Sequence, residues 1–427
     1  MHRLRGLFAG MDRRMLLFLL HTALLQLAVY GITDVILNFY FVSLGYGSDT
    51  IGILQGLGRV GGTITGIPLG IVADRMGARR LTILCALGVG ASYLPLIFLP
   101  TLPMLVLSRF LFGAFFNAMF LAGVPLIAQL VEARYRTRAF ATYQIVGLTG
   151  TSFGTALGGF LPSIVARLFP TVVQSATLPP EQTIFAYAGA LFAAGLFSAL
   201  SVLPLLLFAE PETAAQTRAI QKAKTGEDQP RTFTRTNLWR MTYLSLPMIT
   251  FGITAGMTFP FYNLFLRTRF HQSDEVVGTL LGVAWLIMGA SSVLTPLWDK
   301  RFGRVRAALI LMGMAAVAFF VMSGAAVLAV GVIALYFAVS LRNMIVPLYQ
   351  PLFIESFPPS MRNIASGLNS VLWNGGWFLS SAVSGALLRN HGFGLLYALV
   401  GVGVATTGIS IYLIFRNRPT NVSLEMG

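Results

Sequence analysis

Long apolar segments separated by short polar turns run through the whole chain. Leu81–Leu99 and Gly394–Phe415 are two of these segments. About 20 apolar residues in a helix span a hydrocarbon core roughly 30 Å thick, and backbone groups in lipid must be satisfied within their own segment. The pattern therefore predicts an all-α membrane protein with twelve transmembrane helices. The predicted segments are 15–42, 50–73, 81–100, 103–128, 139–165, 184–208, 239–265, 275–297, 305–324, 327–351, 364–388 and 393–415.

Composition agrees with this pattern. Only 11% of the 427 residues are charged, and the mean hydropathy is +0.75, whereas soluble domains carry about 25% charged residues. The net charge of +15 does not indicate a nucleic-acid partner, because the basic residues lie in short loops between apolar segments. The single cysteine, Cys85, excludes a disulfide or a zinc site built from cysteines of this chain.

The distribution of basic residues predicts the orientation in the membrane. If the N-terminus is cytoplasmic, 23 of the 30 Lys and Arg residues lie on the cytoplasmic side, four outside and three within helices. The four outside are Arg167, Arg267, Arg269 and Arg389. Because cytoplasmic loops are enriched in Lys and Arg, we expect a multi-pass protein of the cell (inner) membrane with both termini cytoplasmic. The segment 15–42 is too long for a signal peptide and is expected to remain as the first helix.

One polar segment, 209–238, divides the chain into two sets of six helices. The predicted organisation is an N-terminal six-helix bundle at 1–208, a cytoplasmic linker at 209–238 and a C-terminal six-helix bundle at 239–427. The halves also repeat: Asp74 and Asp299 follow the second helix of each half and lie 225 residues apart. An even number of helices per half places both copies on one side of the membrane, which is a parallel repeat about an axis along the membrane normal.

The loop Gly70–Arg80, with the sequence GIVADRMGARR, resembles the G-x-L-A-D-R-x-G-x-R-R loop of the major facilitator superfamily (MFS). The resemblance covers nearly the whole chain and implies two six-helix bundles that rock around a central cavity. It also implies that Asp74 caps a facing helix in one conformational state, with neighbouring charges around it. The predicted gating loop comprises Gly70, Asp74, Arg75, Gly77, Arg79, Glu132, Arg138 and Asp299. Charges that only set topology are the alternative.

Two further motifs resemble the drug/proton-antiporter branch of the same family. Arg109–Gly113 is similar to a conserved-arginine motif associated with proton coupling, and Gly150–Gly159 is similar to the antiporter motif G-x-x-x-G-P-x-x-G-G. Thr155 stands where that motif has proline, which bends the helix. Packing of small residues against a neighbouring helix remains the alternative explanation.

Four charged residues lie clearly inside the predicted helices, away from their ends, and each costs about 2.5–3.5 kcal/mol at a helix centre. We expect them to face a wet cavity or one another, because exposure to lipid is so costly. Polar residues recur on the same helix faces, and the resemblance implies that helices 1, 4, 7 and 10 line the cavity. The predicted proton-coupling and substrate residues are Asp34, Arg59, Arg109, Arg342, Asn38, Asn117 and Asn343. A structural Asp34–Arg59 or Asp34–Arg109 pair is the alternative. Further pocket candidates are Tyr262, Asn263, Trp285, Tyr349, Trp373 and Asn374.

These residues predict a secondary-active transporter of a small organic solute, coupled to protons through Asp34, with efflux by antiport as the direction that the Gly150–Gly159 motif favours. A carrier of anionic metabolites is a rival, since three intramembrane arginines face one aspartate. A non-transporting sensor or scaffold is a rival of another class. No enzyme is expected: G-x-G-x-x-G at Gly56–Gly61 lies inside a helix, and no P-loop or H-E-x-x-H motif occurs. We expect no cofactor, metal or nucleic acid, and a monomer in the bilayer.

Overall fold

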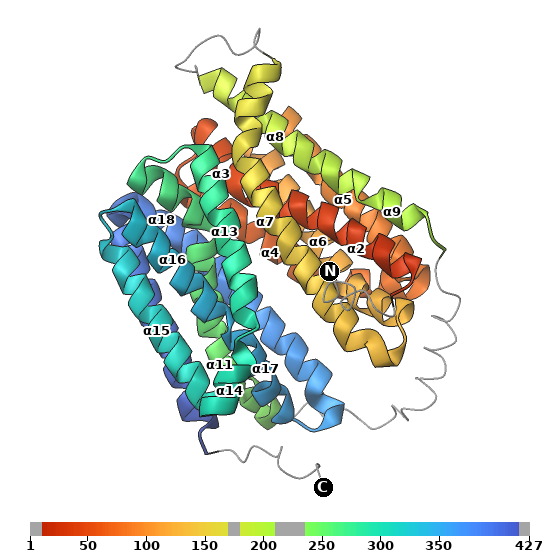
Figure 1. Cartoon of the computed structure of the whole chain (residues 1–427), viewed down its shortest axis with the longest axis vertical. Helices are drawn as coiled ribbons and strands as arrows, with labels where there is room; N and C mark the ends of the chain where they lie inside the picture. Colours follow the sequence, from red (N-terminus) through yellow and green to blue (C-terminus); the bar gives the residue numbers. More distant parts are fainter. Residues whose placement is uncertain (1–10, 170–179, 210–234, 418–427) are drawn as a thin grey trace, which may run out of the picture. The chain divides into compact units, whose positions relative to one another are not determined.

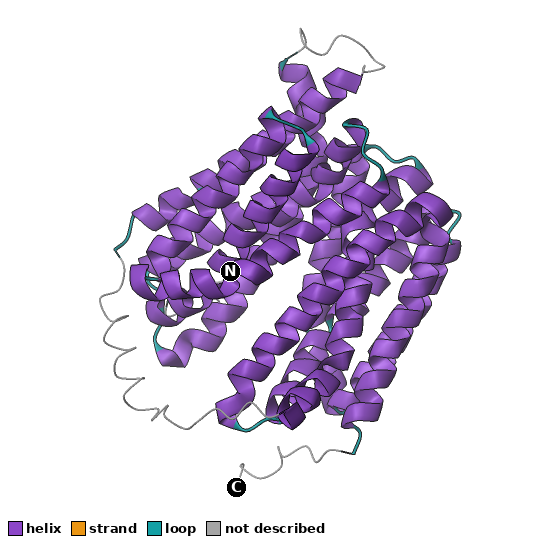
Figure 2. Cartoon of the chain, turned by 180° about the vertical axis from the view of Figure 1, so that it is seen from behind, coloured by secondary structure: helices purple, strands orange, loops and turns teal. Residues whose placement is uncertain are grey.

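Helices form every described element of the computed structural model (Figures 1 and 2). The structure describes residues 11–169, 180–209 and 235–417. The first half contains α2 (Arg13–Gln26), η1 (Leu27–Thr33), α3 (Asp34–Ser43), α4 (Ser48–Met76), α5 (Ala78–Phe98), α6 (Leu102–Leu130), η2 (Ala133–Tyr135), α7 (Arg136–Leu168), α8 (Pro180–Leu200) and α9 (Val202–Leu206). The second half contains α11 (Arg235–Thr258), η3 (Phe259–Phe261), α12 (Tyr262–Leu264), η4 (Phe265–Arg269), α13 (Asp274–Ser292), α14 (Thr295–Phe302), α15 (Arg304–Gly324), α16 (Leu328–Asn343), α17 (Ile345–Glu355) and α18 (Pro359–Phe415).

The prediction of an all-helical membrane protein is confirmed. Among the described residues, nine stretches are long and apolar enough to cross a membrane. One of them, Ile364–Phe415, is long enough for two crossings, and the backbone turns within it at Gly392, where φ is 72°. The long helices α4 and α7, of 29 and 33 residues, complete the twelve. Both are rich in glycine and threonine, which lowers their hydropathy.

The chain forms two compact units. Unit 1 comprises Met1–Pro230, Phe259–Leu286 and Ser381–Asn390, and unit 2 comprises Arg231–Thr258, Ile287–Ser380 and His391–Gly427. Unit 1 therefore contains the first half of the chain together with parts of α13 and α18 and the segment from η3 to η4. The predicted division into bundles at 1–208 and 239–427 stays a prediction, because contacts group these second-half segments with the first half.

The first transmembrane helix is continuous in sequence but not regular. Its middle third, η1, is a π-helix, and the Thr33 hydroxyl donates to the Ala28 carbonyl, five residues earlier, at 2.9 Å. A side chain at Gly154 of α7 would collide with the backbone of Leu27. Single π-helical turns occur frequently at functional sites, and this one ends directly before Asp34.

Two helices of unit 1, α4 and α6, cross at close range because glycines face each other. A Cβ atom at Gly113 would overlap the carbonyl of Gly58, and one at Gly61 would overlap the carbonyl of Phe110. One turn further on, the Asn117 Nδ2 donates to the Gly62 carbonyl at 2.6 Å. Small residues let membrane helices approach this closely and pack through dispersion and hydrogen bonds. The α4–α6 pair therefore forms a fixed support for the arginine that it carries.

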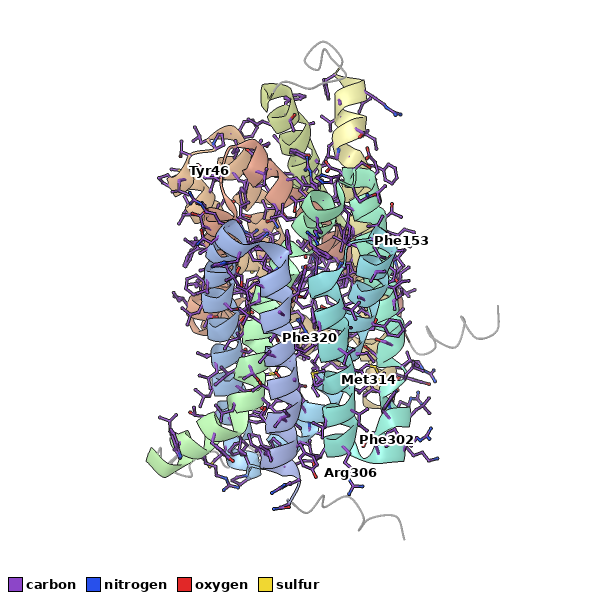
Figure 3. All side chains as sticks on the ribbon, turned by 90° about the vertical axis from the view of Figure 1, so that its left-hand side faces the viewer. Tyr46, Phe153, Phe302, Arg306, Met314 and Phe320 are labelled. Carbon is purple, nitrogen blue, oxygen red and sulfur yellow. The ribbon has the colours of Figure 1, made fainter. Side chains whose placement is uncertain are left out.

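Unit 2 presents apolar side chains outward along its length. On α15, Met314 and Phe320 are exposed, and Arg306 lies exposed in the first turn of the helix (Figure 3). This is the order expected for a helix that leaves the hydrocarbon core at a charged end. In the same unit, Gly256 of α11 packs directly on the backbone of Trp377 in α18, so small residues again set the helix spacing.

Candidate functional site

The accessible face of the first helix ends at Asp34. Leu16, Leu20 and Asp34 are exposed, and Tyr30 is half-buried, whereas every residue from 35 to 41 is buried. The second half repeats this arrangement: Phe259, 225 residues after Asp34, is 37% exposed, and residues 260–266 are all buried. We call Asp34, Phe259 and the accessible side chains grouped with them the ceiling; these side chains are Tyr30, Arg59, Phe116 and Trp285. An exposed carboxylate in the middle of an apolar helix is costly unless it faces a polar space, so the ceiling is the candidate site.

Arginines surround Asp34. Arg109 and Arg59 both act on its carboxylate electrostatically, Arg109 more strongly. Arg59 is also hydrogen-bonded to the hydroxyl of Tyr30, one helical turn before Asp34. The structure thus brings together three of the predicted site residues, Asp34, Arg59 and Arg109, from α3, α4 and α6.

Arg109 is held by neutral partners as well. Its side chain is only 7% exposed; its Nε donates to the Leu54 carbonyl at 3.4 Å, and its Nη2 donates to the Gln55 Oε1 at 3.2 Å. The guanidinium carbon lies 4.6 Å from the centre of the Phe112 ring, a cation–π contact. Arg109 is therefore fixed against α4, and Gln55 connects it to the next group of residues.

That next group is a latch between the first helix and the start of the second half. The Gln55 Nε2 donates to the Asn38 Oδ1 at 2.7 Å, and the Asn38 Nδ2 donates to the Asn263 Oδ1 at 2.9 Å and to the Pro260 carbonyl. The Asn263 Nδ2 in turn donates to the carbonyls of Asp34 and Val35, at 3.0 and 2.8 Å. Asn38 and Asn263 are 0% and 2% exposed. They lie 225 residues apart, so the latch joins equivalent positions of the two repeats.

Two helix crossings flank the latch within unit 1 and are also related by the repeat. On one side, Gly52 of α4 packs on the backbone of Ser381 in α18, and the Ser48 hydroxyl donates to the Gly385 carbonyl at 2.7 Å. On the other side, Gly278 of α13 packs on the backbone of Thr155 and Gly159 in α7. These crossings and the buried runs after Asp34 and Phe259 form a densely packed region of unit 1, which we call its closed end.

Charged and hydroxyl groups surround the α13 crossing. The Tyr187 hydroxyl donates to the Asp274 Oδ2 at 2.7 Å, and Arg267 pairs with Asp274 at 3.2 Å. The Ser163 hydroxyl donates to Glu275. The sequence analysis placed Arg267 outside the membrane but did not predict this cluster, because Tyr187 and Ser163 lie on helices distant in sequence from Asp274 and Glu275.

The remaining predicted cavity residues have hydrogen-bond partners of their own. Arg342, in unit 2, is 2% exposed; its Nη1 donates to the Thr258 hydroxyl at 2.9 Å, and its guanidinium lies over the Phe251 ring. Asn343 donates to the Ser292 hydroxyl at 3.1 Å. Asn117 belongs to the α4–α6 crossing. The structure thus gives each of these residues a partner within its own unit.

The predicted gating loop is described only in part. The surroundings of Gly70 and the side chains of Asp74 and Arg75 lie outside the described residues. Gly77 has φ 88°, and its repeat counterpart Gly303 has φ 72°, conformations that require glycine at both turns.

The other charges of that loop have different partners in the two halves. Arg79 donates to the Leu205 carbonyl at 2.8 Å, and Glu132 pairs with Arg134 at the surface; Arg138 is exposed. In unit 2, Arg304 bridges Asp299, at 3.5 Å, and Glu355, at 3.2 Å.

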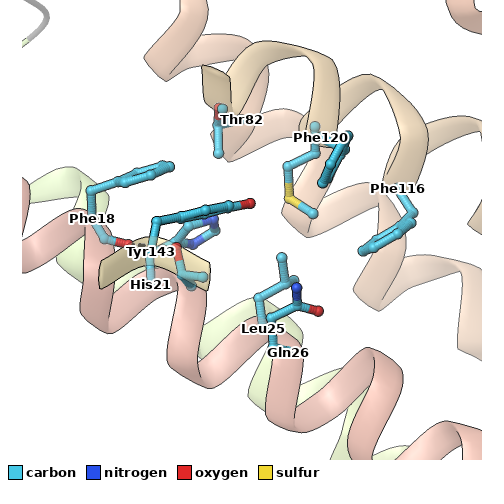
Figure 4. Close-up of a pocket in the computed structure, with 11 residues that line it drawn as sticks. Phe18, His21, Leu25, Gln26, Thr82, Phe116, Phe120 and Tyr143 are labelled. Atoms are coloured by element: carbon cyan, nitrogen blue, oxygen red, sulfur yellow. Dashed lines mark hydrogen bonds between the residues drawn. The ribbon is translucent and has the colours of Figure 1, made fainter. Parts of the chain in front are cut away.

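A small pocket adjoins the ceiling within unit 1. Gln26 of α2 and Phe116 of α6 line it from different helices, with His21 and Tyr143 beside them (Figure 4). The buried Gln26 Oε1 accepts no hydrogen bond from the part of the chain that the structure describes. The His21 Nδ1 contacts the Ser201 carbonyl at 2.8 Å. The pocket thus presents an acceptor next to aromatic walls.

Of the pocket residues predicted from the sequence, Asn263 belongs to the latch and Trp285 belongs to the ceiling. The sequence analysis also missed the role of Gln55 as the connector between Arg109 and the latch. Gln55 lies on the same face of α4 as Arg59, four residues earlier in the sequence. Its role as a connector depends on its contacts with both α6 and α3.

Comparisons with known proteins agree with this architecture. A search of curated proteins finds no matching sequence. Among solved structures, a variant of the nucleoside transporter NupG shares 16% identity, with a TM-score of 0.75, over 95% of this chain and 100% of that one. A D-xylose-proton symporter shares 16% identity, with a TM-score of 0.71, over 94% and 97% of the two chains. A bacterial homologue of the human lysosomal transporter Spinster shares 15% identity, with a TM-score of 0.69, over 94% of both chains.

These likenesses establish the fold. The sequence itself matches the family model described as the Major Facilitator Superfamily over residues 7–381, with a second match at 244–425. The second match begins near the start of the second half, as the internal repeat requires. The chain is therefore a multi-pass membrane transporter of small solutes and belongs to the Major Facilitator Superfamily.

Proposed function

We propose that this protein couples the transport of a small organic solute to protons by alternating access, and that Asp34 is the carboxylate that binds and releases the proton. The observation that carries the proposal is the position of Asp34. It is an exposed carboxylate within a membrane helix, at the end of the accessible face and directly before the latch. A titrating group in a transporter must be reachable from water and connected to the part that opens.

The connection runs through Arg109. Protonation of Asp34 removes the negative charge that attracts Arg109 and Arg59. Arg109 is hydrogen-bonded to Gln55, and Gln55 is hydrogen-bonded to Asn38 of the latch. A proton on Asp34 would therefore change the balance of forces on the latch, and a ligand shifts a conformational equilibrium only by binding its two states differently. The likeness to a proton symporter for D-xylose supports coupling to protons.

The anion-carrier alternative receives less support. It needs arginines with donors available to a carboxylate or phosphate. Arg109 donates to Leu54 and Gln55 and stacks on a phenylalanine, while Arg342 is buried against Thr258. These two guanidiniums must lose their partners before they can bind an anion, and the third, Arg59, lies beside the negative charge of Asp34, which repels an anion.

The direction of transport stays a prediction. The glycines at 150, 154 and 158 of the antiporter-like motif all pack against the first helix, so helix packing accounts for their small size. The sign of the proton movement distinguishes the two directions: a symporter carries protons with its solute, and an antiporter carries them against it.

The test is a proton-flux assay in proteoliposomes loaded with a pH-sensitive dye and challenged with D-xylose, uridine and a panel of aromatic drugs. We expect an active solute to produce a flux that Asp34→Asn abolishes and Asp12→Asn preserves, since Asp12 caps α2 at the surface and asparagine caps equally well. Thermal stability is measured in parallel, because losing Asp34 leaves arginines without their counter-charge. Solute uptake by the wild-type protein with no proton movement would refute the coupling.

The variant Asp34→Asn combined with Arg59→Gln separates function from structure. If it restores stability but not the flux, Asp34 is the coupling residue. If it restores both, Asp34 is half of a structural pair.

A further inference from the structure

Aromatic rings cluster around the ceiling within unit 1. The Tyr30 ring lies 5.2 Å from Phe116, edge to face, and 6.4 Å from Trp285. Trp285 in turn stacks on Phe259 at 6.1 Å. Four rings from the first helix, α6, η3 and α13 thus form one continuous group, and Tyr30 connects it to Arg59 through its hydroxyl.

These rings differ from those that only fill the core. Phe39, Tyr40 and Phe41, on the far side of Asp34, are 0–1% exposed. In the ceiling, Phe259 is 37% exposed, and Tyr30, Phe116 and Trp285 are all half-buried. Ring surface that is left accessible at the level of the charged site can stack on a planar ligand, since offset and edge-to-face contacts with aromatic rings are favourable.

The charged residues of the ceiling restrict the kind of solute that the rings would bind. Arg109 is buried and bound by Leu54, Gln55 and Phe112. Asp34 is exposed, and Arg59, which also contacts Tyr30, is half-buried, so these two charges are at least partly accessible. Their charges cancel, so a charged solute would have to compete with one of them for the other. An uncharged solute with donors and acceptors can bond to both. The adjoining pocket, which shares Phe116, adds the Gln26 acceptor.

The geometry points to an uncharged, planar aromatic or heteroaromatic solute as the substrate class, stacked among Tyr30, Phe116, Phe259 and Trp285 with a hydrogen-bonding edge toward Asp34 and Arg59. This inference rests on the proposed function, because it treats the ceiling as the transport site. Asp34 accepts an N–H or O–H from the edge of the solute, and Arg59 donates to an acceptor beside it.

Saturation-transfer NMR on the purified full chain tests the inference with four matched probes. Benzamide carries a planar ring and an uncharged donor–acceptor edge. Cyclohexanecarboxamide lacks the flat ring, and benzoate and benzylammonium carry opposite charges. We expect benzamide to give the strongest transfer at millimolar concentrations, and Trp285→Leu to lower it by about fivefold, the size of one aromatic stacking contact.

Trp298→Leu is the control, because Trp298 is half-buried and packs on Phe302 of its own short helix, outside the ceiling. Trp285→Phe keeps a ring and should retain most of the signal, which distinguishes stacking from a general loss of folding. No benzamide signal in the wild-type protein, an equal signal from cyclohexanecarboxamide, or equal effects of Trp285→Leu and Trp298→Leu would overturn the inference. Binding needs no proton flux, so binding without flux refutes only the coupling, and flux driven only by D-xylose refutes only the aromatic site.

Discussion

Removing the Asn263 side-chain amide should open the closed end of unit 1. Asn263→Leu keeps the approximate volume but deletes the three hydrogen bonds that Asn263 makes to the first helix: one accepted from Asn38 and two donated to the carbonyls of Asp34 and Val35. Side-chain hydrogen bonds between membrane helices contribute about 0.6 kcal/mol each, so the loss is about 2 kcal/mol. A loss of that size shifts the equilibrium toward the open form by about 30-fold.

Labelling of a buried cysteine measures this shift. Val35 is 0% exposed and follows Asp34 directly, so Val35→Cys should react with a maleimide only when the closed end opens. The native cysteine, Cys85, is also buried, and Cys85→Ser removes it from the background. We expect Asn263→Leu to raise the labelling rate by up to the same factor of about 30.

The control is Asn374→Leu, because the Asn374 amide donates to Ser370 of its own helix. It removes an asparagine of the same size without touching the latch and should leave the labelling rate unchanged. If Asn263→Leu labels no faster than its parent, the Asn38–Asn263 contact does not hold the closed end together. A double-mutant cycle with Asn38→Ala isolates the pairwise energy.

Three further predictions concern packing, the charged cluster and topology. Gly113→Ala should reduce the melting temperature and the yield of folded protein, because the new Cβ would overlap a carbonyl of α4; Gly375→Ala, with nothing within 4 Å, should change the melting temperature little. Arg304→Gln breaks the contacts of one guanidinium with two carboxylates, and we expect an altered rate of labelling at Val35→Cys; an unchanged rate would assign the cluster to topology alone. Reporter fusions within 209–238 should read as cytoplasmic, and an external reading would reverse the predicted orientation.

The twelve helices could be predicted because hydrophobicity is a local property. Each apolar segment is read from its own residues, and a bilayer admits only helices or closed barrels. The π-helical turn at Leu27–Thr33 could not be predicted this way. It lies where the first helix packs against the glycines of α7, which are more than a hundred residues away in the sequence.

The charged residues of the candidate site could be predicted from the sequence, but the contacts that they make could not. Asp34 stood out because an intramembrane carboxylate is costly, and the structure does bring it near Arg59 and Arg109. Whether Arg109 faces a ligand or the Gln55 amide depends on how α4 and α6 cross, which no local pattern specifies. The repeat could also have indicated the latch, because Asn38 and Asn263 are 225 residues apart, which is the spacing between the two repeats.

The same spacing makes Asp34 and Phe259 equivalent positions of the two repeats. The difference between these two side chains bears on the mechanism. The closed end is nearly symmetric: two asparagines form the latch, and glycine crossings flank it on both sides. Symmetric contacts suit a motion in which the repeats exchange equivalent environments. Coupling and recognition need different side chains at the two positions, because an acid can bind a proton while a ring can only stack. Phe259→Asp should therefore add a second carboxylate at the ceiling. We expect it to weaken benzamide transfer while the latch, and hence the labelling rate of Val35→Cys, stays the same. A large change in that rate would mean that the ceiling and the latch are not separable.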